Sequence, residues 1–332
     1  MTTEPTSNCR RAHRSFRSRR VTHVGAGCGL LALVVLAAAC SGSSSRASTP
    51  TSTAATTSTT NTRGPTAAQA ALVAVRPFTV HEPPGVPAAA PKPLLILLHG
   101  YGASGAIQEA YLKLTPATDA HGMLFVHLDG TLNGQNKRFW NATDACCGFR
   151  STVDDSAYIT AVIADVSAHY KVDPSRVFIV GHSNGGFMSY RMACDHSDKI
   201  AAIVSIEGAT WSDPSRCKPT EAVATLEVHG LADETIKYDG GGIATATYPG
   251  AMTTVQAWAR DDGCTLAADS PAAAPHTIVA QLAPATVLSY SKGCTPNGHA
   301  ELWTQPGGVH IPAFGPTFPD QVVTFLLAHP KR

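Results

Sequence analysis

The chain has 332 residues and a formal net charge of +1; 44% of its residues are hydrophobic and 15% are charged. This balance fits one large α/β domain accompanied by non-globular segments. It gives no electrostatic case for nucleic acid as a partner, because such a partner requires a marked excess of Lys and Arg.

The first forty residues have the pattern of an export signal. Several arginines precede the apolar stretch from Val24 to Ala39, which is short and rich in Gly and Ala for a membrane span. The stretch ends in small residues before Cys40, as in a bacterial lipobox, so we expect a lipid on Cys40 that anchors the mature protein to a membrane. The alternative is ordinary signal cleavage with Cys40 as a bystander. The residues before the stretch leave the choice between Sec and twin-arginine export open.

Residues 41–69 consist mainly of Ser, Thr, Ala, Gly and Pro. They show no apolar periodicity that would offset the entropy lost on ordering, so we expect a disordered tether. The chain therefore divides into an export signal (1–39), a lipidated cysteine with its tether (40–69) and a catalytic domain (70–332). We expect the domain to face the cell envelope or the exterior, either anchored at the membrane or secreted.

Beyond the tether, β-type runs alternate with helix-type segments, which predicts a mainly parallel sheet with helices on both faces. The predicted strands are 78–81, 94–99, 124–128, 177–181, 201–206, 225–229 and 301–304. The predicted helices include 156–170, entered from an N-cap at Asp154 or Asp155, then 184–195, 251–260 and about 320–328. In such a sheet, ligands bind at the carboxyl ends of the strands.

The most informative segment is 177–186, where an apolar run leads into Gly181-His182-Ser183-Asn184-Gly185 and a helix follows. This G-x-S-x-G turn predicts a nucleophile elbow and with it an α/β-hydrolase fold. An acid and a base follow in the order that this fold requires, at Asp233 and His310. We therefore expect Ser183 to be the nucleophile, Asp233 the acid and His310 the base.

Other histidines and acids compete for these roles. His299 is the main competitor to His310, but it precedes the 301–304 strand and should lie at the far edge of the sheet from Ser183. Asp239 is the fallback for Asp233, which comes directly off the 225–229 strand. His99, His182 and His229 sit beside strand ends, where a neutral, hydrogen-bonded histidine is the usual explanation.

The turn after the 94–99 strand is rich in glycine, at a point where the backbone must approach a reacting carbonyl group. It predicts an oxyanion hole formed by the backbone N–H groups of Tyr101 and Asn184. Nothing in the sequence has the spacing of a metal site, and the chemistry needs no cofactor.

Six cysteines follow the signal, and export would place them in an oxidising compartment, so three disulfides are predicted. Cys264 and Cys294 flank one β-excursion and are expected to pair. Because adjacent cysteines rarely bridge each other, Cys146 and Cys147 are expected to pair with Cys194 and Cys217, in an order that stays open.

These blocks resemble the secreted polyhydroxyalkanoate depolymerase and feruloyl or acetylxylan esterase family. The resemblance runs from about Arg76 to the C-terminus and is carried by residues 93–100, 139–142, 146–148, 153–155, 173–177, 181–190, 229–233, Tyr238, 240–241 and 307–310. It implies the same roles for Ser183, Asp233 and His310. The chain departs from the family in two ways: it lacks a tryptophan soon after His310, and it has Glu207 where a small apolar residue is commoner. Both departures are expected to reshape the substrate cleft.

The expected reaction is two-step ester hydrolysis through an acyl-enzyme. Only residues 207–224 separate the 201–206 and 225–229 strands, which leaves no room for a large cap domain. We therefore expect an open cleft that suits polymeric or bulky esters, with Trp140 and Tyr238 as candidate cleft walls or as core aromatics. The alternatives are an envelope acyltransferase with the same triad and a non-catalytic polymer-binding lipoprotein. We expect the protein to be a monomer.

Overall fold

The computed structural model describes residues 64–269 and 272–332. The expected export signal, Cys40 and most of the expected tether lie outside these ranges. The folded part begins earlier than expected, because helix α1 (Ala67–Val75) starts inside the segment assigned to the tether. Thr66 and Gln69 form a capping box that satisfies free N–H groups at the start of α1. Within the described ranges, no helix is both long enough and apolar enough to cross a membrane.

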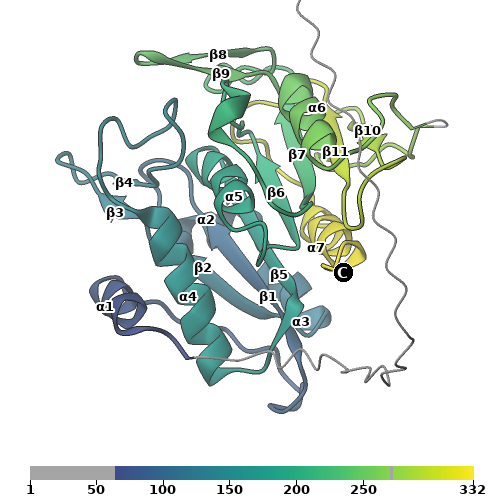
Figure 1. Ribbon diagram of the computed structural model, residues 1–332. Helices are drawn as coiled ribbons and strands as arrows, with labels where there is room; N and C mark the ends of the chain where they lie inside the picture. Colours follow the sequence, from purple (N-terminus) through teal and green to yellow (C-terminus); the bar gives the residue numbers. More distant parts are fainter. Residues whose placement is uncertain (1–63, 270–271) are drawn as a thin grey trace, which may run out of the picture. The chain divides into compact units, whose positions relative to one another are not determined.

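A seven-stranded sheet forms the centre of the domain, in the order β10-β11-β7-β6-β5-β1-β2 (Figure 1). Its strands are β1 (Lys92–Leu98), β2 (Leu124–Leu128), β5 (Val172–His182), β6 (Ala202–Ile206), β7 (Ala224–Gly230), β10 (Thr286–Tyr290) and β11 (Ala300–Gln305). Every neighbouring pair is parallel except β10 with β11. The predicted mainly parallel sheet of an α/β-hydrolase is confirmed.

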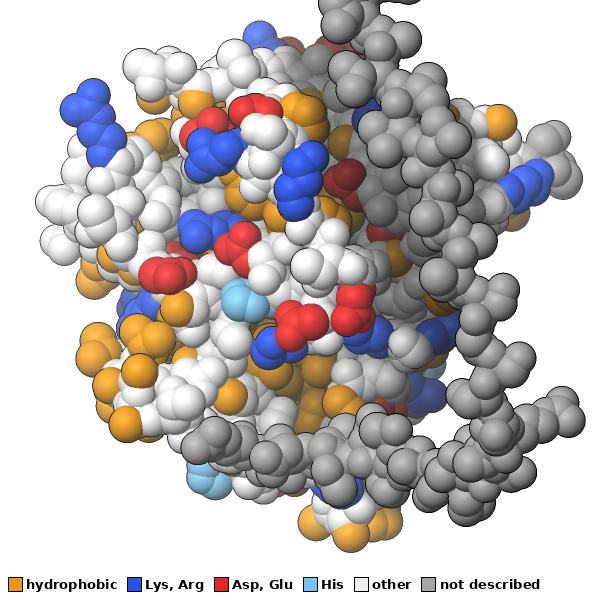
Figure 2. All heavy atoms as spheres, viewed as in Figure 1, with side chains coloured by type: hydrophobic (Ala, Val, Ile, Leu, Met, Phe, Trp, Pro, Cys, Tyr) orange, Lys and Arg blue, Asp and Glu red, His pale blue; other side chains and the backbone are white. Residues whose placement is uncertain are grey.

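Helices cover both faces of this sheet, and for that reason β1 is buried along its whole length. Leu94, Ile96 and Leu98 pack on one face, toward α4 (Asp155–His169), α5 (Asn184–Asp195) and α6 (Ala251–Asp261). Leu95 and Leu97 pack on the other, toward α2 (Gly105–Leu112), α3 (Thr115–Ala120) and α7 (Phe318–Ala328). On the face that carries α4, α5 and α6, acidic and basic side chains are interspersed (Figure 2).

Some elements differ from the sequence prediction. Residues 78–81 form only an isolated bridge between His81 and Phe125, because the prolines at 83 and 84 have no N–H group with which to extend a ladder. The antiparallel edge strand β10 was not predicted. Two small hairpins were also missed: β3 (Thr131–Leu132) with β4 (Arg138–Phe139), and β8 (Gly240–Ile243) with β9 (Ala246–Pro249).

The connection from β6 to β7 holds no inserted domain. Its only regular element is a short 3-10 helix, η1 (Pro214–Arg216). Within the described residues, this connection therefore places no large cap over the carboxyl edge of the sheet, as its length predicts.

Three disulfides join the six cysteines of the described domain, and the pairing corrects one expectation. Cys264 pairs with Cys294 as predicted. Cys194, near the end of α5, pairs with Cys217 after η1, and Cys146 pairs with Cys147. The prediction that the adjacent cysteines would bridge to Cys194 and Cys217 is wrong. The Cα atoms of Cys194 and Cys217 lie 5.5 Å apart, within normal bridging distance, so these two residues satisfy each other and leave the adjacent pair together.

Candidate active site

Ser183 stands at a sharp turn between β5 and α5. Its φ of 55° and ψ of −118° are strained values for a residue with a side chain. Two glycines make the turn possible: a Cβ on Gly181 would overlap the backbone of Gly185, and a Cβ on Gly185 would overlap the backbone of Leu98. The turn has the strand, strain and close helix approach of a nucleophile elbow.

His310 and Asp233 extend a hydrogen-bond chain from this serine. The Nε2 atom of His310 lies 2.9 Å from the Ser183 hydroxyl oxygen, and its Nδ1 atom lies 2.7 Å from Oδ2 of Asp233. Asp233 follows β7 and His310 follows β11, so all three side chains meet at the carboxyl edge of the sheet. His299 precedes β11, where its ring contacts the Glu301 carboxylate, so it lies at the opposite end of that strand.

Backbone N–H groups bind the carboxylate oxygen of Asp233 that does not face His310. Its Oδ1 atom accepts hydrogen bonds from the backbone N–H groups of Thr235 and Ile236, at 2.7 and 2.9 Å. Burial opposes ionisation of Asp233, but the hydrogen bond and charge of His310 and the hydrogen bond from the Ile236 N–H together lower its pKa. Asp233 is therefore an ionised acceptor aimed at Nδ1 of His310, which fixes the tautomer that leaves Nε2 facing Ser183.

The backbone that follows β1 passes directly beside the nucleophile. A Cβ added to Gly100 would lie 3.5 Å from Cβ of Ser183, in van der Waals contact, and 3.3 Å from Nδ1 of His182. Tyr101 is next in this turn, and Asn184 is the first residue of α5, where N–H groups have no partner inside the helix. Both expected oxyanion donors thus lie on backbone segments that adjoin Ser183.

His99 and His182 agree with the neutral, hydrogen-bonded state that their positions predict. His99 donates from Nδ1 to the Gly100 carbonyl oxygen and accepts from the Gly130 N–H at Nε2. His182 donates from Nε2 to the carbonyl oxygen of His310. Burial lowers the pKa of each to about 4, so both rings are uncharged at neutral pH.

Trp140 is not a cleft wall. Its side chain is 0% exposed, and its indole N–H donates to the carbonyl oxygen of His99. The side chain of Asn184 bonds both the N–H and the C=O of Trp140, at 2.7 and 2.9 Å. Trp140 therefore fills the core and ties the loop after β4 to the first turn of α5.

Tyr238 lies against β7 and β11. Its hydroxyl is hydrogen-bonded to that of Thr304, and its ring meets the ring of His229 edge-on at 5.7 Å. These contacts give the half-buried Tyr238 a packing role behind the acid, and no described contact joins it to Ser183.

The expectation for His229 is wrong, because two buried carboxyl groups, Glu227 on the same strand and Glu207 after β6, lie beside its ring. Burial disfavours its charged form, but the hydrogen bond to Glu227 and the charges of Glu207 and Glu227 raise its pKa to about 9. The Nδ1 atom lies 2.9 Å from the Glu227 carboxylate, and Nε2 donates to the carbonyl oxygen of Ile236. Sequence reasoning identified Glu207 only as a family departure and missed Glu227, although residues i and i+2 of a strand lie on one face and this spacing could have paired Glu227 with His229.

Glu207, His229 and Asp233 offer ligand atoms that lie within 4.8 Å of one another, which raises the question of a metal ion. A metal ligand needs a free lone pair on the imidazole ring. Both ring nitrogens of His229 are already engaged, and the bond to a backbone carbonyl requires Nε2 to carry a proton. The group fits a hydrogen-bonded charge cluster better than a metal site.

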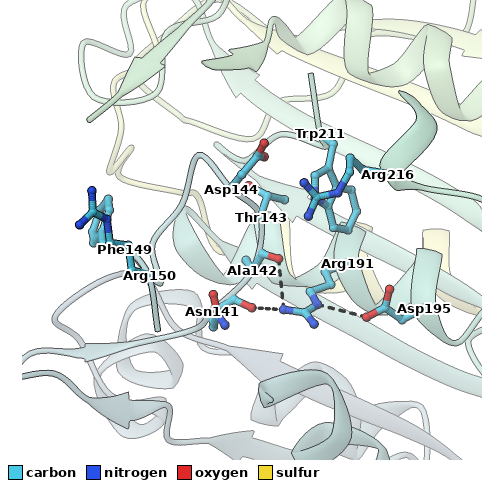
Figure 3. A pocket seen from close by; sticks show the side chains of 10 residues that line it. All are labelled: Asn141, Ala142, Thr143, Asp144, Phe149, Arg150, Arg191, Asp195, Trp211 and Arg216. Carbon is cyan, nitrogen blue, oxygen red and sulfur yellow. Dashed lines mark hydrogen bonds and ion pairs between the residues drawn. The ribbon is translucent and has the colours of Figure 1, made fainter. Parts of the chain in front are cut away.

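A cavity of about 300 Å³ lies along α5, between the loops 141–150 and 211–216 (Figure 3). Its side chains include Arg191, whose guanidinium is already bonded to Asp195 and to the backbone carbonyls of Asn141 and Ala142. Trp211 forms part of the wall. Ser183, Asp233 and His310 do not line this cavity, so it is separate from the candidate active site.

Known proteins that are similar to this chain include several esterases. The family described as Phospholipase/Carboxylesterase matches residues 85–257, a little over half of the chain. This segment contains Ser183 and Asp233, whereas His310 lies beyond it, within hydrogen-bond distance of Ser183.

Among curated relatives, NocK of Nocardia uniformis subsp. tsuyamanensis, named as an esterase, is 33% identical over 188 residues, which are 55% of this chain and 53% of NocK. Feruloyl esterase B of Piromyces equi is 28% identical over 198 residues, which are 57% of this chain and 36% of that protein. The matches thus span about half or less of the length of these relatives.

Among solved structures, the acetyl xylan esterase from Aspergillus awamori superposes with a TM-score of 0.54 and 15% identity, covering 75% of this chain and 93% of that one. At this identity the likeness concerns the fold alone. The profile match over residues 85–257, together with the seven-stranded sheet and its serine elbow, shows that the chain belongs to the phospholipase/carboxylesterase family of α/β-hydrolases.

Proposed function

We propose that the protein is an exported serine esterase that hydrolyses carboxylic esters through Ser183, His310 and Asp233. The observation that carries this proposal is the hydrogen-bond chain from the Ser183 hydroxyl through His310 to Asp233, with separations of 2.9 and 2.7 Å. Such a chain, built on a strained elbow at the carboxyl edge of the sheet, is the arrangement that activates a serine hydroxyl.

In the first step the Ser183 oxygen attacks the ester carbonyl carbon while Nε2 of His310 takes the hydroxyl proton. The tetrahedral intermediate collapses, His310 returns that proton to the leaving alcohol, and an acyl-enzyme remains. Water then attacks the acyl-enzyme with His310 again as base, which releases the acid and restores the serine. Asp233 stays ionised throughout and stabilises the imidazolium that forms in each step.

Negative charge that develops on the carbonyl oxygen needs donors that are already in place. The N–H groups of Tyr101 and Asn184 are the proposed donors, and the amino-terminal end of α5 adds its partial positive charge. One such donor typically contributes about 3 to 4 kcal/mol of transition-state stabilisation.

The surroundings of the triad favour a bulky or polymeric substrate. Val309 and Ile311 flank His310, Leu231 precedes Asp233 by two residues, and all three side chains are exposed. Tyr101 is 40% exposed and meets the ring of Phe149, itself 51% exposed, at a centroid distance of 6.4 Å. Apolar side chains that stay in solvent around an uncapped site suit an extended acyl chain or an aromatic acyl group better than a small buried ester.

This surface and the relatives support two substrate classes. Proteins named feruloyl esterase and acetylxylan esterase are among the matches, which supports esters carried on polysaccharides. Polyhydroxyalkanoate-like polyesters are the second class that the open apolar rim would accept. Hydrolysis of such polymers fits an exported enzyme with a lipid anchor at Cys40 and a tether that separates the anchor from the domain.

The anchor has its own test, because Cys40 is remote in sequence from the catalytic residues. Mass spectrometry of the mature protein should find an N-terminal Cys40 bearing a diacylglycerol group, and Cys40→Ala should release the protein from membranes with unchanged activity per molecule. Cleavage at another position would refute the anchor and leave the esterase proposal intact.

A panel assay tests the activity itself. The purified domain is incubated with short p-nitrophenyl esters, hydroxybutyrate oligomers and feruloyl or acetyl sugars, with and without an added acceptor alcohol. We expect ester hydrolysis that Ser183→Ala lowers by about four to six powers of ten, while the exposed Ser212→Ala leaves it unchanged. Turnover that survives Ser183→Ala with an unchanged melting curve would refute the nucleophile, and preferential transfer to the alcohol would show an acyltransferase.

A further inference from the structure

A second buried carboxyl group, that of Glu207, lies close to Asp233. Glu207 directly follows β6 and is 1% exposed. Its φ of 52° places it in the left-handed region, which is costly for a residue with a side chain. Its N–H donates to the carbonyl oxygen of Val228 on β7, which holds the backbone in this conformation. Glu207 was expected to reshape the substrate cleft, but its side chain is buried and does not line the cleft.

The Glu207 carboxyl group is fixed by neighbours on β7 and the loop that follows. Both of its oxygens lie 3.1 Å from the backbone N–H of Gly230, and Oε2 lies 3.3 Å from Nε2 of His229. Ligand atoms of Glu207, His229 and Asp233 all fall within 4.8 Å of one another. Glu207 and Asp233 are thus adjacent carboxyl groups in a buried space.

Two buried carboxyl groups at this distance do not both ionise readily. Asp233 has two backbone donors and His310 to stabilise its charge. For Glu207, burial raises the pKa well above its usual range, and the neighbouring Asp233 adds to this shift. The proton of the pair therefore belongs on Glu207.

His229 keeps Glu227 as a hydrogen-bonded counterion when Glu207 is protonated. Its Nδ1–H is bonded to Glu227, and its Nε2–H is bonded to the carbonyl oxygen of Ile236. Glu227 in turn accepts from the hydroxyl of Tyr190 and the N–H of Gly208. The pair of His229 and Glu227 is self-contained, which leaves the proton of Glu207 free to face Asp233.

We propose that Glu207 is a positioning residue of the triad, a neutral carboxylic acid that donates a hydrogen bond to Asp233 and so holds Asp233 against His310. This inference rests on the proposed function. With two N–H donors on Oδ1 and His310 on Oδ2, the bond from Glu207 completes the set of donors around Asp233 and restricts rotation of its carboxylate. No proton leaves Glu207 during the reaction, and Asp233 stays ionised throughout.

Loss of Glu207 should affect the reaction rate. The orientation of Asp233 sets the orientation of His310, and His310 must reach the Ser183 hydroxyl. Small displacements of a catalytic group cost about 100-fold in rate when they approach 1 Å. Glu207→Leu should therefore lower kcat by about 10- to 100-fold with little change in KM. Glu207→Gln keeps a neutral side chain with an N–H donor and should recover most of the lost rate.

Glu227→Gln is the matched control. Glu227 is equally buried and also contacts His229, but it has no contact with Asp233. If Glu207 acts on the triad, Glu227→Gln should lower the melting temperature without the kcat effect of Glu207→Leu. If both variants lower kcat equally, Glu207 serves only the stability of the cluster and the proposal is wrong.

The rate is measured as labelling of Ser183 by a fluorophosphonate and as hydrolysis of p-nitrophenyl acetate. Labelling depends on activation of the serine and not on the natural ester, so a wild-type protein that is not labelled would contradict the proposed function itself. A wild-type protein that is labelled, with Glu207→Leu labelled at the same rate, would overturn only the role of Glu207.

Infrared spectroscopy tests the proton directly and does not depend on folding of the Leu variant. The difference spectrum of wild type minus Glu207→Gln at neutral pH should show the carbonyl stretch of a protonated carboxylic acid. A carboxylate band in its place would show that Glu207 is ionised, and the proposal would fail.

Discussion

The imidazole of His182 is hydrogen-bonded through Nε2 to the backbone carbonyl oxygen of His310, at 2.8 Å. The two rings lie 5.1 Å apart, so the residue just before the nucleophile holds the loop that carries the base. Tyr111 also stabilises this loop, because its hydroxyl donates a hydrogen bond to the carbonyl oxygen of Pro312. The segment after His310 is thus fixed by side chains from β5 and α2.

Replacing His182 tests this arrangement. His182→Phe keeps an aromatic ring but removes the donor to His310, so the loop should loosen and kcat should fall about tenfold with little change in KM. Steady-state kinetics on a p-nitrophenyl ester measures the effect, and His127→Phe on edge strand β2 is the control. An equal loss in both variants would indicate general destabilisation.

His310 and His299 should give opposite phenotypes. His310→Ala removes the proton acceptor of Ser183 and should lower kcat by several powers of ten, as Ser183→Ala does. His299→Ala removes a contact with the Glu301 carboxylate at the opposite end of β11 and should lower only the melting temperature. Kinetics and thermal melts of the two variants check this, and exchanged phenotypes would mean that His310 is not the base.

His182 also predicts how stability depends on pH. Its pKa is about 4 in the folded protein because burial disfavours the charged ring, whereas the unfolded value is about 6.5. Between these values the unfolded chain binds the proton and the folded protein does not. His182 therefore lowers the free energy of unfolding as the pH falls from about 6.5 to 4, by up to about 3 kcal/mol, and has no such effect above pH 6.5.

Urea denaturation of wild type and His182→Phe at several pH values isolates this contribution, because the other titrating groups are common to both proteins. The free energy of unfolding of wild type should fall more steeply between pH 6.5 and 4 than that of the variant. Parallel curves would show that His182 is not a buried neutral residue.

Much of the site could be predicted from sequence because its signals are local. The G-x-S-x-G turn between a strand and a helix specifies Ser183, and the boundaries of α5 match the predicted helix. Chain order then indicated Asp233 and His310 at the ends of later strands, and the lengths of the intervening segments excluded a large cap. Local patterns of this kind depend on backbone geometry that a few residues impose.

The missed features depend on contacts between segments that are distant in sequence. His229 was expected to be neutral, and only the packing of β6 beside β7 brings Glu207 to its ring. Trp140 was a candidate for the cleft, and its burial follows from the bonds to Asn184. The Gly-rich strand β8 has little intrinsic tendency to form a strand, so its pairing with β9 was not visible in the sequence.

The three disulfides should differ in their contributions to stability, because a crosslink stabilises chiefly by restricting the unfolded chain and does so more for longer loops. Cys194 and Cys217 are 23 residues apart, and Cys264 and Cys294 are 30 apart, so removing either bridge should lower the free energy of unfolding by about 3 to 4 kcal/mol. The bridge between adjacent Cys146 and Cys147 closes almost no loop. Each disulfide can be removed by a double Cys→Ser substitution, and the three variants compared by denaturant unfolding should include two that are strongly destabilised and one that is close to wild type. The variant close to wild type should be Cys146→Ser/Cys147→Ser. If this variant is destabilised as much as the other two, the Cys146–Cys147 pair stabilises the fold through native contacts instead.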